Sequence, residues 1–173
     1  MDNNTYRGAH VVFYKDTCTD KNCKKYHVKT VLLVKRTLDA PIHPGLWSLP
    51  GGKKDDKRDK CPEDTANNEV KEELMSVQEY NQENSEKICI TEALKTSIEY
   101  LCSVDNHVYF KAVLNNDNEM DDLILRRKYL KGHKNYIKDH NDNKVEGEGI
   151  GWFSEEEVRN MRIRPQDRKA LMS

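Results

Sequence analysis

Short apolar runs bounded by polar stretches dominate the first part of the chain. Residues 7–14 (RGAHVVFY) and 29–36 (KTVLLVKR) are rich in β-branched residues, which predicts two strands. Residues 46–49 (LWSL) predict a third short extended segment, which the Pro-Gly-Gly run at 50–52 ends. A polar connection over residues 15–27 separates the first two strands.

A helical period replaces this pattern at Pro62. Proline suits the first helical position, and Ala66, Val70, Leu74 and Val77 then recur at helical spacing, which predicts a helix over 62–76 with one apolar stripe. The residues before it, Asp59-Lys60-Cys61, form a poor cap, whereas Glu63 and Asp64 suit the positive end of the helix dipole.

The remaining chain continues the alternation of strands and helices. Residues 93–103 and 107–114 predict a strand pair, 149–153 (GIGWF) a last strand, Ser154 with Glu157 a capping box for a helix over 155–161, and Pro165 a short final helix. Residues 120–130 (MDDLILRRKYL) fit an amphipathic helix. This order predicts an α/β layered domain, and with no repeat or linker we expect one domain over 1–173.

Composition narrows the class of protein. The 173 residues are 36% apolar and 34% charged, and two Trp and eight Tyr favour folding over disorder. A formal net charge of -1 gives no general attraction to nucleic acid or membrane. The sequence shows no membrane span or signal-peptide pattern, and its five cysteines indicate reduced thiols. We therefore expect a soluble cytoplasmic protein with no membrane or nucleic-acid partner, and its oligomeric state stays open.

Three glutamates carry the strongest chemical signal. Glu69, Glu72 and Glu73 stand at i, i+3 and i+4, so they share one helix face beside the apolar stripe. Like charges at this spacing repel, and a hard divalent cation such as Mg²⁺ or Mn²⁺ removes that penalty. A solvated charged face is the plainer alternative; the extended LWSLPGG segment leading into the helix favours the metal site.

The same stretch resembles the Nudix box. Gly52 matches the opening glycine of that motif, and NEVKEELM matches its helical part; GLWSLPGGK upstream and GIGWFSEEEV downstream are also similar to Nudix hydrolases. The resemblance implies an α/β/α sandwich around a central mixed sheet. It also implies metal-dependent cleavage of a pyrophosphate bond in a nucleoside diphosphate linked to another moiety, such as a nucleoside triphosphate or nucleotide sugar. The alternative is a Nudix-like domain that binds a nucleotide with weak or no hydrolysis.

The resemblance also implies roles for particular residues. Glu69, Glu72 and Glu73 correspond to the catalytic metal ligands for Mg²⁺ or Mn²⁺, and the Gly51 carbonyl is a further ligand candidate. Gly51, Gly52 and Lys53 are candidates for contact with the nucleotide substrate; an ordinary surface lysine is the alternative for Lys53.

A loop before the last strand supplies one more candidate. Many Nudix proteins place a glutamate there as base or extra ligand, and Glu146 fits the spacing from Trp152 better than Glu148 does. Trp47 and Trp152 are candidates for stacking on a base, although a Trp in a short strand more often belongs to the core.

Two departures from the box bear on activity. Asn68 replaces the arginine before Glu69, and Met75 replaces the final glycine. Asparagine cannot supply positive charge, so we expect Glu69 to be less well oriented and Asn68→Arg to increase hydrolysis.

The early glutamate of the box is also missing. Five residues beyond Gly52 the chain has Arg58, and the count back from Glu69 reaches Lys60, so the loop is two residues longer. The candidates for a replacement acid are Asp55, Asp56 and Asp59.

Two weaker patterns point to other chemistry. Cys18, Cys23 and His27 loosely suggest zinc, but three ligands do not close a structural site. Residues 126–138 (RRKYLKGHKNYIK) interleave basic residues with tyrosines and suggest contact with RNA or phosphate; a net charge near zero favours a solvated helix face.

Overall fold

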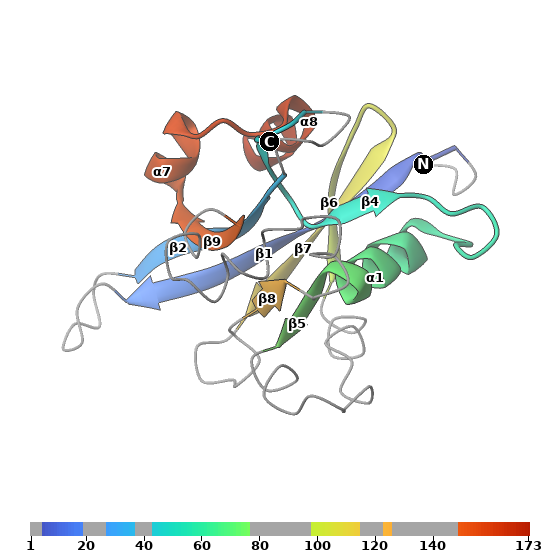
Figure 1. The fold of residues 1–173 in the computed structure, drawn as a ribbon, viewed down its shortest axis with the longest axis horizontal. Helices are drawn as coiled ribbons and strands as arrows, with labels where there is room; N and C mark the ends of the chain where they lie inside the picture. The colour runs from blue at the N-terminus through green and yellow to red at the C-terminus, as the bar shows by residue number, and fades with distance from the viewer. Residues whose placement is uncertain (1–4, 19–26, 37–42, 77–97, 115–122, 126–148) are drawn as a thin grey trace.

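A central sheet lies between helices in the computed structural model, which describes residues 5–18, 27–36, 43–76, 98–114, 123–125 and 149–173 (Figure 1). The helices are α1 (Pro62–Glu73), α7 (Glu155–Asn160) and α8 (Pro165–Leu171). The sheet strands are β1 (Gly8–Cys18), β2 (His27–Lys35), β3 (Trp47–Ser48), β4 (Gly51–Lys53), β6 (Glu99–Val104), β7 (His107–Leu114) and β9 (Ile150–Ser154). β5 (Leu74–Ser76) and β8 (Leu123–Leu125) form a separate small sheet.

Strand β1 organises the sheet. It pairs in parallel with β7 and antiparallel with β2 and β4, so the sheet is mixed. β6 joins β7, while β3 and β9 join β2, all antiparallel. Asp105 and Asn106, with φ of 49° and 66°, make the β6–β7 turn that the sequence predicts.

Alternating residues of β1 face two cores. Ala9, Val11 and Phe13 pack with the α1 stripe on one face. Val12 packs on the other face with Val158 of α7 and with residues of α8. Because both faces are covered, the central strands read as nearly continuous apolar runs. In Figure 1, α1 and the α7–α8 pair lie on opposite sides of the sheet, which confirms the expected α/β/α sandwich.

Most predicted elements are present with shifted ends. Ala66, Val70 and Leu74 are at most 1% exposed, as the apolar stripe predicts; Val77 lies outside the described residues. Ser154 and Glu157 form the predicted capping box, and Cys61 caps α1 without a side-chain hydrogen bond.

Two helix predictions are wrong because of tertiary pairing, and one strand was not predicted. The helix expected over 62–76 ends at Glu73, since Leu74–Ser76 are extended and pair with β8. Within the helix expected over 120–130, residues 123–125 instead form β8, and the rest lie outside the described residues. The Pro-Gly-Gly run does end the extended segment, since β3 stops at Ser48, but Gly51 and Gly52 then form β4 with Lys53 and pair with β1.

A buried polar network joins α8 to the sheet and to the chain just before β4. The Asp167 carboxylate, fully buried, accepts hydrogen bonds from the Leu49 backbone N–H at 2.9 Å and from the Tyr109 hydroxyl at 2.7 Å. Arg164 donates to the same carboxylate at 2.7 Å, and its guanidinium also lies 3.2 Å from Nε2 of the buried His10. This network ties the segment that leads into β4 to the C-terminal helix.

Among the described residues, no helix is long and apolar enough to cross a membrane.

We expect Asp167→Ala to lower the free energy of unfolding by about 3–5 kcal/mol, because the largely buried Arg164 would be left as an uncompensated charge. Urea unfolding measures the change. Glu155→Ala, which removes an exposed ion pair with Arg159, is the control and should cost less than about 1 kcal/mol. A loss below about 1 kcal/mol for Asp167→Ala would contradict this account.

Acid should weaken the fold through His10. Burial, followed by the charge of Arg164 and then His107, lowers the pKa of His10 well below its ordinary value of 6.5. Tyr109 and Asp167 also line this network. Below about pH 6.5, His10 is protonated in the unfolded chain but stays neutral in the folded protein. The free energy of unfolding therefore falls as the pH drops.

The comparison between wild type and His10→Gln isolates this effect. Glu69 and Glu73, with raised pKa values, act in the opposite direction and are present in both proteins. Between about pH 6.5 and 5.5, wild type should lose about 1 kcal/mol more stability than the variant. The uptake of one proton by the unfolded chain can change the free energy of unfolding by at most about 1.4 kcal/mol per pH unit. Parallel pH profiles in urea unfolding would rule His10 out as the titrating group.

Candidate metal and substrate site

Two of the three predicted glutamates face the glycine pair of β4. The Gly51 backbone N–H donates to Oε2 of Glu73 at 3.3 Å, and Glu73 is only 9% exposed. At Gly52, any Cβ atom would overlap the Glu69 carboxylate, Oε2 first. The last turns of α1 therefore bring both carboxylates against the backbone of β4.

The two glycines of β4 matter for different reasons. Gly51 has a φ of 146°, and a Cβ there would overlap the Ala9 carbonyl and His10. Gly52 instead leaves room for the side chain of Glu69. The first glycine lets the chain pass close to β1, and the second admits a carboxylate.

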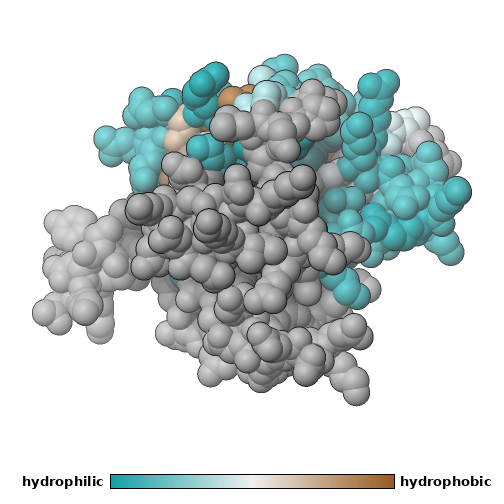
Figure 2. Space-filling view, viewed as in Figure 1, coloured by the Kyte–Doolittle hydropathy of each residue, from teal (hydrophilic) through white to brown (hydrophobic). Residues whose placement is uncertain are grey.

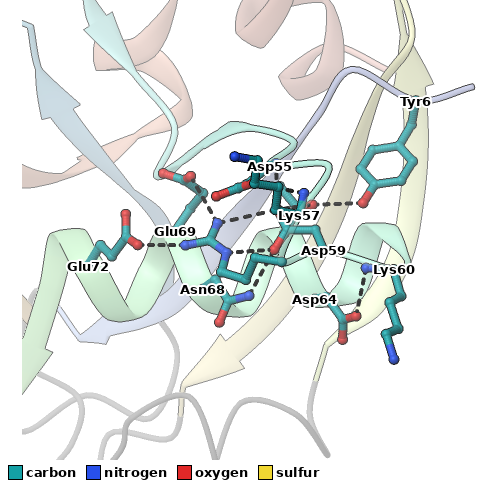
Figure 3. Close-up of polar contacts among 11 residues, drawn as sticks. Tyr6, Asp55, Lys57, Asp59, Lys60, Asp64, Asn68, Glu69 and Glu72 are labelled. Atoms are coloured by element: carbon teal, nitrogen blue, oxygen red, sulfur yellow. Dashed lines mark hydrogen bonds and ion pairs between the residues drawn. The ribbon is translucent and has the colours of Figure 1, made fainter. Parts of the chain in front are cut away.

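The third glutamate, Glu72, is exposed and is held by Arg58. Nη1 of Arg58 lies 2.6 Å from Oε1 of Glu72, and Nη2 lies 3.5 Å from Oε1 of Glu69. Figure 3 labels both glutamates along the helix, with Asp59 in the connection beside it. Arg58 belongs to the connection between β4 and α1, whose described surface is hydrophilic (Figure 2). One guanidinium thus bridges two of the predicted metal ligands.

Asp59 anchors that guanidinium and is buried. It accepts hydrogen bonds from Arg58 Nε at 2.7 Å, from Asn68 Nδ2 at 2.9 Å, from Thr65 Oγ1 at 2.9 Å and from the Asp55 backbone N–H at 2.9 Å. Burial alone would raise its pKa, but these hydrogen bonds, Arg58 first, outweigh burial and hold the pKa of Asp59 well below its ordinary range. Asp59 therefore stays ionised against α1.

Of the three candidates for the missing early acid, Asp59 is the one that contacts the helix. Asp55 accepts from the Lys57 backbone N–H, and Asp56 pairs with Lys54 at 3.6 Å on the surface.

The positive charge that Asn68 cannot supply to Glu69 comes from another residue. Asn68 hydrogen-bonds to Asp59, and Arg58, ten residues earlier, brings its guanidinium to 3.5 Å from Glu69. The structure therefore gives no reason for Asn68→Arg to increase activity, because a guanidinium already reaches Glu69. The sequence signal for this was present: Arg58 occupies the place where the box has its early acid.

Burial disfavours the ionised forms of Glu69 and Glu73. Burial raises the pKa of Glu73 well above its ordinary value, and the negative charge of Glu69 adds to the shift. Burial also raises the pKa of Glu69, with Glu72 as the next cause and Arg58 acting in opposition. A bound cation would relieve this cost, since it favours the ionised forms.

The donor set fits a hard divalent cation. In the described part of the chain, no three His, Cys, Asp or Glu side chains already converge as a metal site. Mg²⁺, however, is commonly held by one or two carboxylates together with substrate phosphates and water. Glu69 and Glu73, with the Gly51 carbonyl as a candidate, meet that requirement.

Of the candidate phosphate and base residues Lys53, Glu146 and Glu148, only Lys53 lies among the described residues. Lys53 is exposed at the end of β4, where its backbone pairs with Gly8. Glu146 and Glu148 lie outside the described residues, as does the basic run 126–138.

The candidate zinc ligands lie at the edge of the described residues. Cys18 and His27 are cross-strand partners at the ends of β1 and β2, but their side chains and all of Cys23 lie outside what is described.

Both tryptophans are partly buried. Trp47 packs edge-on against Phe153 with ring centroids 4.9 Å apart, and Trp152 packs against the core on the α1 side, with Lys15 Nζ 5.4 Å from its ring centroid. These contacts favour the core interpretation of Trp47 and Trp152.

A family model described as the NUDIX domain matches residues 22–173. The chain belongs to the NUDIX family. This confirms the resemblance seen in the sequence and, with it, the class of enzyme, a hydrolase of the Nudix type. Among curated proteins, no sequence matches.

Solved structures support the fold. The NUDIX domain of Shewanella oneidensis NrtR, solved with ADP ribose, is 15% identical with a TM-score of 0.54, covering 97% of this chain and 84% of that one. A mutT/nudix family protein from Listeria innocua is 14% identical with a TM-score of 0.50, covering 99% and 90%. At these identities the likeness concerns the fold.

The two glycines should respond differently to alanine. Gly51→Ala should destabilise the fold by about 1–3 kcal/mol or more, because it combines a glycine-only φ with overlap on backbone atoms. Gly52→Ala should cost less than about 1 kcal/mol, since the Glu69 side chain can move, but should weaken Mn²⁺ binding by about tenfold. Urea unfolding and Mn²⁺ titration measure these. Unaltered Mn²⁺ affinity in Gly52→Ala would remove Glu69 from the site.

Proposed function

We propose that this NUDIX protein is a metal-dependent pyrophosphohydrolase of the cytoplasm. Its substrate would be a nucleoside diphosphate linked to another moiety, of the nucleoside triphosphate or nucleotide-sugar type. The observation that carries the proposal is the meeting of Glu69 and Glu73 with the glycine pair of β4, where a buried carboxylate and a second carboxylate lie against the same short strand.

Different residues would bind the metal ion and the substrate phosphates. Glu69 and Glu73, with Glu72 beside them and the Gly51 carbonyl as a further candidate, would hold Mg²⁺ or Mn²⁺. Such an ion neutralises phosphate charge and acidifies bound water. The glycine pair keeps side-chain bulk away from this point, and Lys53 at the exposed end of β4 is a candidate phosphate contact. Glu146 remains the candidate for a base or an extra ligand.

A nucleotide-binding domain with weak or no hydrolysis is the second candidate. The observation that favours it is the 2.6 Å ion pair between Arg58 and Glu72, which engages a predicted ligand. The ADP ribose complex of the NrtR domain shows that this fold can bind a nucleotide.

Turnover distinguishes the two candidates. The protein would be assayed for phosphate-containing products on a panel of nucleoside triphosphates, ADP-ribose, other nucleotide sugars and dinucleoside polyphosphates, with Mg²⁺ and with Mn²⁺. At saturating metal, Glu72→Gln should nearly abolish hydrolysis. Nucleotide binding without turnover for every substrate would support the binding domain instead, and full activity in Glu72→Gln would remove this helix from the reaction.

Glu73→Gln should separate metal binding from fold stability. Because Glu73 is buried with a raised pKa, its ionised form destabilises the metal-free protein, so at pH 8 the metal-free variant should melt at or above the wild-type temperature. Mn²⁺ should raise the melting temperature of wild type and do so less in Glu73→Gln. Glu156→Gln, which changes an exposed glutamate of α7, is the control and should respond as wild type does. An equal Mn²⁺ response in Glu73→Gln would exclude Glu73 as a ligand.

A further inference from the structure

We propose that Arg58 is the positioning residue for the metal-binding carboxylates, and that it does from the β4–α1 connection what an arginine on the helix would otherwise do. This inference rests on the proposed metal-dependent function. It assigns to Arg58 a role that lies outside the helical residues Glu69, Glu72 and Glu73.

The first support is the set of contacts that one guanidinium makes. Arg58 donates to Asp59 through Nε at 2.7 Å and through Nη2 at 3.3 Å, and to Glu72 through Nη1 at 2.6 Å. Nη2 also lies 3.5 Å from Glu69. The planar fork thus reaches the carboxylates of Asp59, Glu69 and Glu72 at once. A lysine ammonium on a flexible stem does not do this in a defined geometry.

The second support is that Arg58 is itself held in place. Its main partner, Asp59, has no exposed side-chain surface and is fixed to α1 by Thr65 and Asn68. Asn68 therefore acts on the glutamates through Asp59 and Arg58. An anchored guanidinium restricts the rotamers of Glu69 and Glu72 in a way that a free surface arginine would not.

The third support is the choice of carboxylate oxygen atoms that Arg58 contacts. Arg58 approaches Oε1 of both Glu69 and Glu72. Oε2 of Glu69 faces Gly52, and Oε2 of Glu73 accepts from the Gly51 N–H. The guanidinium thus engages Oε1 of Glu69, and we assign Oε2, the oxygen on the side toward β4, to the cation.

The test is Mn²⁺ binding, followed by the paramagnetic resonance signal of free Mn²⁺ without any substrate. Arg58→Met should weaken Mn²⁺ affinity by about 10–100-fold, the usual loss when the support of a metal ligand is removed. Arg58→Lys keeps the charge and should also lose affinity, which covers the case in which Arg58→Met folds poorly. Lys57→Met removes the same charge from the same connection at an exposed side chain and should bind Mn²⁺ as wild type does.

Moving the arginine to position 68 tests whether Arg58 positions the glutamates, because Mn²⁺ affinity would not recover if Arg58 only stabilised the connection. Asn68→Arg in the Arg58→Met background should restore Mn²⁺ affinity to within about threefold of wild type, whereas Asn68→Arg alone should give no gain.

Two outcomes separate this inference from the proposed function. Wild type that fails to bind Mn²⁺ would overturn both. Wild type that binds, with Arg58→Met binding equally well or more tightly, would overturn only the role of Arg58 and would make it a counter-charge that competes with the metal.

Discussion

The buried carboxylate of Asp59 holds the site together. It accepts hydrogen bonds from its own connection and from two residues of α1, and it binds the guanidinium that reaches Glu69 and Glu72. A buried carboxylate is tolerated only when nearly all of its acceptor positions are used, so its partners have little freedom. The β4–α1 connection is therefore fixed to the helix although it is charged and lies at the surface.

A second buried network restrains β4 from the other face of the sheet. Asp167 accepts from the Leu49 backbone, and Arg164 joins Asp167 to His10, which packs against Gly51. The glycine pair thus lies between the glutamates of α1 and the cluster around α8. Both networks use polar groups that cost stability unless every partner is present, which gives the short strand a defined position.

The apolar patterns of the chain predicted the layers of this fold because burial follows local periodicity. Residues 7–14, 29–36 and 107–114 form strands, the stripe from Ala66 to Leu74 faces the core, and Ser154 caps a helix as its spacing predicts. The failures lie where pairing with a distant segment outweighs local preference. Leu74–Ser76 leave the helix to pair with β8, and Gly51 and Gly52 form β4, a separate strand that was not predicted.

For the site, the sequence by itself determined that Glu69, Glu72 and Glu73 share a helix face behind a glycine pair, because helical spacing alone sets that relation. Only the tertiary structure decided that Glu69 and Glu73 meet β4 while Glu72 meets Arg58. It also decided that Asp59, among three neighbouring aspartates, is the buried one, and that the positive charge missing at Asn68 comes from ten residues earlier. The fold of an irregular connection is set by the few buried hydrogen bonds it can make with the rest of the chain, and no local pattern of residues specifies which of them form.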